Sequence, residues 1–161
     1  MKISKALKMK NRLAGDIAVL KQRITENNVA VVDRGDSGFD VMALYENFQK
    51  ATESLVAIKT AIAMANGGNV VNSGSVGTVN AYRIYKMAEL KGMIEMLRNL
   101  DTRNGKFNEG TRFGDVPIVT EYRATISRSK ADEMIVGLTD QIESLQDDTD
   151  AFNATAEINI D

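Results

Sequence analysis

The chain has no cysteine, no histidine, no tryptophan and a single proline. Without cysteine it can form neither disulfides nor a thiolate nucleophile, and without histidine it lacks the side chain most used for zinc binding and for acid–base catalysis near neutral pH. Carboxylates, lysine and tyrosine remain as catalytic groups. The scarcity of proline favours long uninterrupted helices, because proline breaks a helix interior. We therefore expect a non-enzymatic protein without a metal or a cofactor.

A long apolar run and a strong excess of one charge are also missing. No stretch approaches the roughly 18 apolar residues that a transmembrane helix needs. The basic start, from Met1 to Leu7, is not followed by the apolar core of a signal peptide. The formal net charge of −2 gives no general attraction to nucleic acid. We expect one domain over residues 1–161, outside the membrane and cytoplasmic, or in a virion if a phage encodes it.

The clearest pattern in the sequence runs from Val41 to Ala65. Its apolar residues alternate between spacings of three and four, which is a heptad seam over the whole stretch. The pattern predicts a long helix, capped by Asp40, that packs against other helices along a narrow apolar edge. The seam residues are Val41, Leu44, Phe48, Ala51, Leu55, Ile58, Ile62 and Ala65.

The same periodicity predicts three more helices. Ser129, with Asp132 and Glu133, resembles a capping arrangement at the start of the last one. The expected spans are Ile3 to Asn27, Thr78 to about Arg103, and Ala131 to Phe152. Their apolar stripes are, in order, Ile3, Leu7, Leu13 or Ala14, Ile17, Leu20 and Ile24; Ile84, Met87, Leu90 or Lys91, Ile94, Leu97 and Leu100; and Ala131, Ile135, Leu138, Ile142, Leu145, Thr149 and Phe152.

One segment has the pattern of a β-strand. It runs from Ile118 to Ile126, directly after Pro117, and proline is tolerated at the first position of a strand. Ile118, Thr120, Tyr122 and Ile126 share one face. A lone strand is unstable, so this strand needs a partner. Three partners are open: the short apolar piece from Val29 to Val32, the alternating tail from Ala156 to Asp161, which is a possible extended arm, or a strand of another subunit.

The remaining segments read as loops. Residues 33–39, 66–77 and 106–116 are rich in glycine, asparagine and aspartate, without periodicity. The glycine-rich loop at 66–77 lacks the Gly-Lys-Ser/Thr of a phosphate-binding loop. The acidic run of Asp147, Asp148 and Asp150 lacks the glycine turn and final glutamate of a calcium loop. We therefore read both as structural segments.

Charge is distributed unevenly between the two ends of the chain. Residues 1–15 carry Lys2, Lys5, Lys8, Lys10 and Arg12 and no acid, whereas residues 131–161 carry nine acids and no base. Both groups oppose the helix macrodipole. The conflict is relieved if the start of the first helix lies beside the end of the fourth, either within one chain or head to tail between subunits. Two independent solvated faces, or a basic patch for nucleic acid, are the alternatives.

Several segments together resemble the septicolysin-like family of small bacterial and phage proteins. The opening carries Ala6-Leu7 and Arg12-Leu13 and then Ile17, Leu20, Arg23 and Ile24. Similar positions are the loop at Asn66 before Thr78, the segment from Lys86 to Leu100, the strand with the fourth helix, and the ending Asn153-x-Thr155-x-Glu157-Ile158. The resemblance covers most of the chain. It implies a small helical protein and supplies no catalytic residues, because the function of the family is largely unknown.

These observations predict a mainly α fold of four long antiparallel helices, bundle-like or coiled-coil-like, with a minor β element. The expected function is that of an oligomeric structural or assembly protein, such as a phage virion component. An intracellular binding or regulatory module, whose basic first helix contacts nucleic acid or an acidic partner, is the alternative. The expected contact residues are Ile118, Thr120, Tyr122, Ile126, Ile158, Ile160, Lys2, Lys5, Lys8, Asp147, Asp148 and Asp150. Other copies, and other virion or assembly proteins, are the expected partners; a membrane is not, and nucleic acid is disfavoured.

Overall fold

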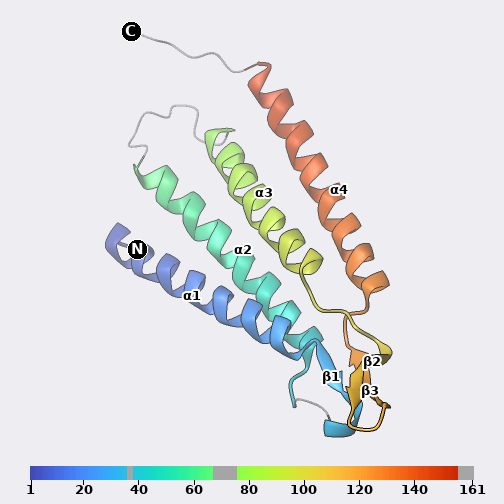
Figure 1. Cartoon of the computed structure of the whole chain (residues 1–161). Helices are drawn as coiled ribbons and strands as arrows, with labels where there is room; N and C mark the ends of the chain where they lie inside the picture. The colour runs from blue at the N-terminus through green and yellow to red at the C-terminus, as the bar shows by residue number, and fades with distance from the viewer. Residues whose placement is uncertain (36–37, 67–75, 156–161) are drawn as a thin grey trace.

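The computed structural model describes residues 1–35, 38–66 and 76–155. Four helices make up most of it, with a small three-stranded antiparallel sheet at one end (Figure 1). The prediction of a mainly helical fold with a minor β element is therefore confirmed. In chain order the elements are α1 (Ile3–Asn27), β1 (Val29–Val31), the 3-10 turn η1 (Val32–Arg34), α2 (Val41–Asn66), α3 (Val76–Arg98), β2 (Gly105–Arg112), β3 (Val116–Ala124) and α4 (Arg128–Asn153).

The helices lie side by side in chain order. α1 packs on α2, α2 also packs on α3, and α3 packs on α4 (Figure 1). Neighbouring helices run in opposite directions, so α1 begins and α4 ends away from the sheet. Within the described residues no ion pair or hydrogen bond joins α1 to α4. The outer sides of these two helices are therefore the edges of the row.

The helix α2 buries more than the predicted seam. Asp40 caps it as expected, because its Oδ1 accepts a hydrogen bond from the Ala43 N–H at 3.0 Å. Most seam residues are buried or half-buried, although Ala65 is exposed. A second set of residues is buried beside the seam, because α2 lies between α1 and α3 and is covered on two sides. This second set consists of Tyr45, Thr52, Val56 and Thr60.

The core is made mainly by α3 with the inner faces of its neighbours. Met87, Met93 and Met96 are buried there, which agrees with the reading of the methionine-rich stripe as core. The stripe is wrong at one position, because Ile84 is 51% exposed. The helix is also shorter than predicted and ends at Arg98. Leu97 and Ile24 are fully buried within the main cluster, whereas Leu55 and Ile58 form a smaller one with Ala6 between α1 and α2.

Burial of Tyr45 on α2 makes stability sensitive to high pH. The ring lies 6.1 Å from that of Phe48, and burial raises the pKa of Tyr45 to about 12. The unfolded chain releases the Tyr45 hydroxyl proton near pH 10. The contribution of the buried, protonated hydroxyl to the free energy of unfolding is therefore complete below about pH 10 and is lost between about pH 10 and 12. We expect the free energy of unfolding to fall over that pH range by about 2 kcal/mol less in the Tyr45→Phe variant than in the wild type. Urea titrations at a series of pH values measure this difference. Equal losses in both proteins would contradict this assignment.

The cap of α4 lies two residues before the predicted one. Ser127, not Ser129, is the N-cap, and its hydroxyl accepts a hydrogen bond from the Lys130 N–H at 3.2 Å. The predicted stripe is confirmed, because all its residues from Ala131 to Phe152 are buried or half-buried. The helix thus turns one apolar side toward α3 and leaves the opposite side to solvent.

The sheet has the order β1-β3-β2, so β3 is the central strand. The piece at Val29–Val31 pairs with Tyr122–Ala124, which confirms one of the three partners left open by the sequence. The other partner, β2, falls in a segment predicted as a loop, and that prediction is wrong. The ladder between β2 and β3 is interrupted between Asn108 and Thr111, where Gly110 adopts a φ of +117° that favours glycine.

Asn28 joins three parts of the fold at the junction of helices and sheet. Its side chain is fully buried. The amide nitrogen donates to the carbonyl oxygens of Asp101 at 2.8 Å and Ile126 at 2.9 Å, and the amide oxygen accepts from the Ile126 N–H at 2.7 Å. The end of α1 is thereby tied to the segments that leave α3 and enter α4.

None of the helices in the described residues combines the length and the apolar character needed to cross a membrane.

Candidate functional site

Of the strand residues expected to form contacts, two are partly exposed and two are buried. Ile118 and Thr120 are half-buried, Tyr122 is 9% exposed and Ile126 is fully buried. Ile126 also lies beyond the end of β3, next to Asn28. Tyr122 and Ile126 are covered by the chain itself, which corrects their assignment to a contact surface. Ile158 and Ile160 lie outside the described residues.

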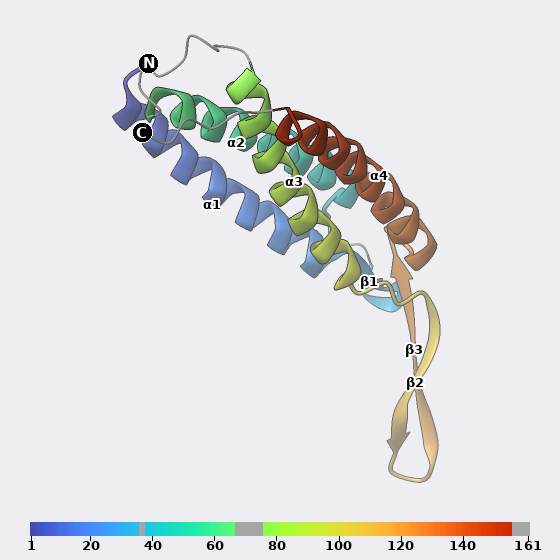
Figure 2. The ribbon, with the colours of Figure 1, turned by 90° about the horizontal axis from the view of Figure 1, so that it is seen from above.

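The β2–β3 hairpin projects away from the helices (Figure 2). Its tip is a turn in which Gly114 and Asp115 have positive φ angles of 90° and 60°. Large apolar side chains stand exposed along it, and the ring of Phe113 is completely open to solvent. We call this set the hairpin surface, and its members are Phe107, Phe113, Val116 and Val119.

A polar cluster holds the base of this hairpin. The Arg103 guanidinium lies 4.1 Å from the centre of the Tyr122 ring, and the Tyr122 hydroxyl donates to Glu109. That bond to Glu109 raises the pKa of Tyr122. Arg103 also donates to Asp101 at 2.8 Å, and this hydrogen bond lowers the pKa of the Asp101 carboxyl. The base of the hairpin is therefore fixed to the segment that links α3 to β2, while its tip extends outward.

The central strand keeps one free edge near the tip. β1 covers β3 only from Tyr122 to Ala124, whereas β2 follows β3 from Val116 to Tyr122. In the part of the chain that the structure describes, residues 116–121 of β3 have no strand on the side of β1. Unpaired strand edges of this kind are places where another chain can add a strand.

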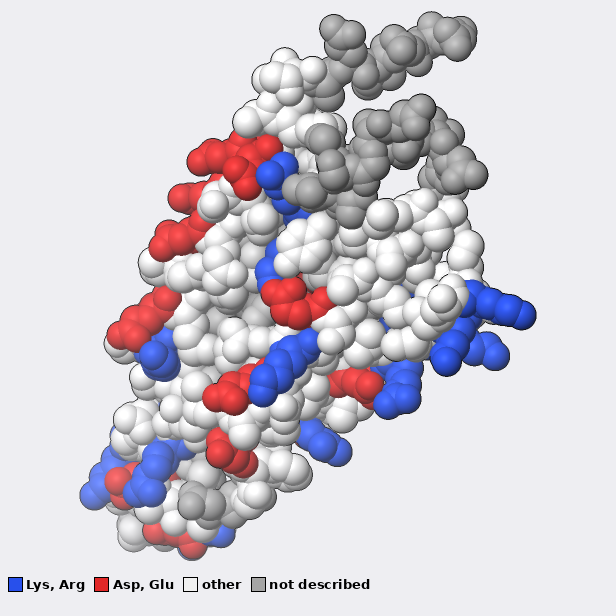
Figure 3. Space-filling model, turned by 180° about the vertical axis from the view of Figure 1, so that it is seen from behind, with Lys and Arg blue, Asp and Glu red and all other residues white. Residues whose placement is uncertain are grey.

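Opposite charges lie on the two outer helices. The outward side of α1 carries exposed bases, and the outward side of α4 carries exposed acids, so the two signs lie on different flanks (Figure 3). We call these sides the basic face of α1 and the acidic face of α4. The basic face comprises Lys5, Lys8, Arg12, Gly15 and Val19, and the acidic face comprises Val136, Asp140, Glu143, Asp147 and Asp150.

Some predicted charged residues are engaged within the chain. Asp148 pairs with Arg83 of α3 at 3.2 Å, so it belongs to the protomer more than to the acidic face. Asp150 accepts a hydrogen bond from Gln146, one helical turn earlier, and remains exposed. Lys2, Lys5 and Lys8 are exposed, and no described residue forms an ion pair with them. The predicted bases and acids are therefore not brought together inside one chain.

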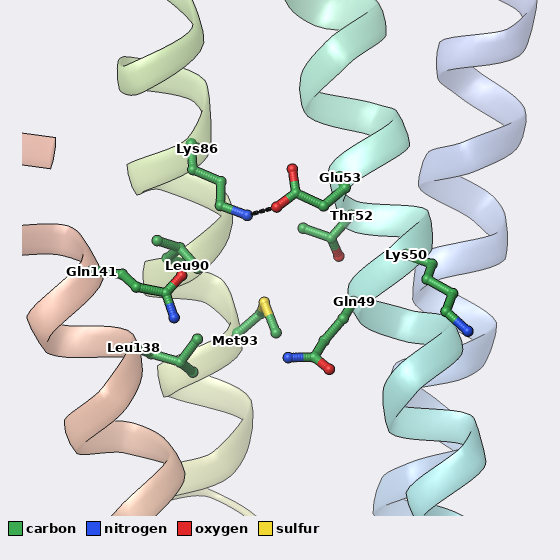
Figure 4. A pocket seen from close by; sticks show the side chains of 9 residues that line it. All are labelled: Gln49, Lys50, Thr52, Glu53, Lys86, Leu90, Met93, Leu138 and Gln141. Carbon is green, nitrogen blue, oxygen red and sulfur yellow. Dashed lines mark hydrogen bonds and ion pairs between the residues drawn. The ribbon is translucent and has the colours of Figure 1, made fainter.

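A shallow groove of about 310 Å³ lies over α3 between α2 and α4 (Figure 4). Lys86 points across it to Glu53, with which it forms an ion pair, and burial lowers the pKa of Lys86. The Thr52 hydroxyl donates to the Phe48 carbonyl oxygen at 2.8 Å. Lys50 and leucine, methionine and glutamine side chains form the rest of the lining. Lys86, Glu53 and Thr52 are thus already engaged with neighbours.

The acidic run at the end of α4 forms no ligand set. Among residues 1–35, 38–66 and 76–155, no three acidic side chains gather closely enough to hold a metal ion. Asp147 and Asp150 face outward, whereas Asp148 turns toward Arg83. The glycine-rich loop that we considered for phosphate lies largely outside the described residues.

The hairpin surface was missed from the sequence. β2 carries polar residues on both faces and two glycines, so it shows no alternation of apolar and polar positions. One signal was present: Gly114-Asp115, between Phe113 and Val116, is typical of a hairpin turn. Read together with the strand that follows, this pair predicts the missing strand.

No family model, no curated protein and no solved structure matches the chain. The resemblance to the septicolysin-like family therefore stays a prediction, and function has to be inferred from these surfaces.

Proposed function

We propose that this protein is a non-enzymatic building block that assembles with copies of itself, as a component of a virion or of another intracellular particle. The observation that carries the proposal is the projecting hairpin surface. Its apolar side chains stand on a strand pair that extends beyond the helices, where no other described part of the chain covers them. Such a surface favours contact with another protein, because exposed apolar patches mark interaction sites.

The energetics favour a contact at this hairpin. Burying one large apolar side chain in an interface contributes roughly 1.5–3 kcal/mol. Phe113 and Val119 together can therefore supply a large part of a micromolar affinity, which corresponds to about 8 kcal/mol. The polar cluster at Arg103 and Tyr122 limits the motion of the hairpin base, so less conformational entropy is lost on binding.

The row of helices supports the same proposal. We propose that its four antiparallel helices form part of a bundle or coiled-coil-like wall that is completed by neighbouring copies. Membership of the septicolysin-like family, and a cytoplasmic or virion location, are part of this proposal. They rest on the sequence resemblance.

We expect the double variant Phe113→Ser, Val119→Thr to weaken self-association about 10- to 100-fold, because each tenfold change corresponds to about 1.4 kcal/mol. Sedimentation equilibrium of the purified chain measures this. The control is Met64→Ser, which removes an exposed apolar side chain far from the hairpin, on α2. The proposal fails if the hairpin variant and the control associate as strongly as the wild type.

A second function is favoured by one observation, the exposure of Lys2, Lys5 and Lys8 at the start of α1. These bases could contact nucleic acid or an acidic partner. Such binding to generic DNA falls steeply with rising salt. Absence of DNA binding at low salt would remove nucleic acid from consideration and leave assembly as the better explanation of the bases.

A further inference from the structure

We infer that the basic face of α1 in one copy packs antiparallel against the acidic face of α4 in the next copy, so that copies join head to tail. This inference rests on the proposed self-assembly and names the surfaces and register that perform it. The hairpin surface is a separate contact, so the two can be tested independently.

The two faces are exposed sides of regular helices, and on α1 the exposed Arg12 also pairs with Asp16, one turn later, at 3.8 Å. On α1 the inward side carries Ala6, Leu13 and Ile17 against α2, and the basic face lies on the opposite side. On α4 the inward side carries Ala131, Leu138 and Thr149, and the acidic face lies opposite. Both faces keep the alternating spacing of three and four residues that allows two helices to pack along their length.

One antiparallel register places three bases of α1 opposite three acids of α4. Placing Lys5 opposite Asp150 brings Lys8 opposite Asp147 and Arg12 opposite Glu143. The same register sets Gly15 opposite Asp140 and Val19 opposite Val136. Val19 and Val136 are both exposed, at 47% and 59%, so this contact would bury two apolar side chains beside three base–acid pairs.

The direction of the helices fits a repeating contact. Along the row α1, α2, α3 and α4 alternate in direction, so an α1 antiparallel to α4 continues the alternation (Figure 1). The added copy then has the same orientation as the first one. Each copy offers one basic and one acidic face, which makes the contact heterologous. Heterologous contacts give rings or open filaments.

The charges at the start of α1 and at the end of α4 have the sign that the helix dipole disfavours at each end. Bases at the start of a helix and acids at its end oppose the helix macrodipole. The first turn of α1 has no acidic residue, its Lys2 cap makes no side-chain hydrogen bond, and the last turn of α4 has no base. Lys5 in the first turn of α1 and Asp150 in the last turn of α4 are thus unfavourable within their own helices, whereas the proposed contact places them opposite each other.

Two charge-reversed variants test the inference. One carries Lys5→Glu, Lys8→Glu and Arg12→Glu, and the other carries Glu143→Lys, Asp147→Lys and Asp150→Lys. Each variant alone presents like charges at the proposed contact, so we expect the weight-average mass in light scattering to fall toward that of one chain. An equimolar mixture restores opposite charges at both contacts, and we expect the mass to return to the wild-type value.

A matched control separates this contact from net charge. The variant Lys21→Glu, Lys91→Glu, Arg98→Glu changes the net charge by the same amount as the first reversed variant, at exposed positions outside the basic face. We expect it to keep the wild-type mass.

The outcomes distinguish this inference from the proposed function. Wild-type mass for either reversed variant alone, or a mixture that stays dissociated, overturns the head-to-tail contact. If the chain still associates through the hairpin surface in that case, the proposed function stands. A wild-type chain that is a monomer at every concentration overturns both.

Discussion

Replacing Asn28 by alanine is expected to lower the free energy of unfolding by about 3–5 kcal/mol. The side chain is fully buried and makes three hydrogen bonds, to the carbonyl oxygens of Asp101 and Ile126 and from the Ile126 N–H. Alanine leaves these backbone groups without partners inside the protein, and each such group costs about 1–3 kcal/mol. Urea denaturation followed by circular dichroism measures the loss.

Two related variants give this prediction its controls. Asn27→Ala removes a side chain whose one hydrogen bond to a described residue is to the Arg23 carbonyl oxygen of its own helix, so we expect a change below about 0.5 kcal/mol. Asn28→Asp keeps the shape but turns a carboxylate toward two carbonyl oxygens. We expect it to be more destabilising than alanine at neutral pH and partly relieved in acid. Similar losses for Asn27→Ala and Asn28→Ala would show that Asn28 does not join these segments.

Replacing Leu97 by alanine is expected to lower the unfolding free energy by about 2–5 kcal/mol and the melting temperature by roughly 10 °C. Leu97 is fully buried on α3 and belongs to the main cluster, which contains residues of all four helices. Alanine removes its apolar contacts and leaves a cavity where helices meet. Differential scanning calorimetry and urea denaturation both measure the effect.

Ile84→Ala is the matched control for Leu97→Ala. Both residues lie on α3 and both belong to the apolar stripe predicted from the sequence, but Ile84 is 51% exposed and Leu97 is not exposed at all. We expect Ile84→Ala to cost less than about 1 kcal/mol. An equal cost at the two positions would contradict the packing of α3 described above.

Periodicity was sufficient to predict the helices but not their packing. The spans of α1 and α2 follow directly from the heptad spacing, and the inward stripe of α4 is confirmed. Burial of Tyr45, Thr52 and Val56 was missed, because a single narrow heptad seam predicts a helix that packs against one neighbour only. α2 has a neighbour on each side, and only the three-dimensional arrangement reveals the second buried stripe.

The sheet was predicted in part, for reasons of composition. β3 alternates between inward and outward residues, so it was found, and Val29–Val31 was recognised as one of its possible partners. β2 is exposed along nearly all its length, and its residues are selected by hydrogen bonding to β3 more than by burial. Such a strand carries little hydrophobic signal, so the hairpin surface could not be placed from periodicity.

The charge pattern was read correctly from the sequence, whereas its spatial relation was left open. Bases at the start of α1 and acids at the end of α4 were both found. Whether they meet within one chain depends on whether the row of helices closes, and no heptad pattern determines that. In the structure the two charged faces lie on opposite flanks, and this placement is the basis of the contact that we propose between copies.

The most direct measurement is the light-scattering mass of the full chain across a concentration series, from about 1 to 100 μM, at low salt and again at high salt. At low salt we expect a mass above that of one chain that increases with concentration, because heterologous contacts keep adding copies. High salt should lower this mass, because it screens the base–acid pairs. A constant mass of one chain at every concentration would contradict assembly.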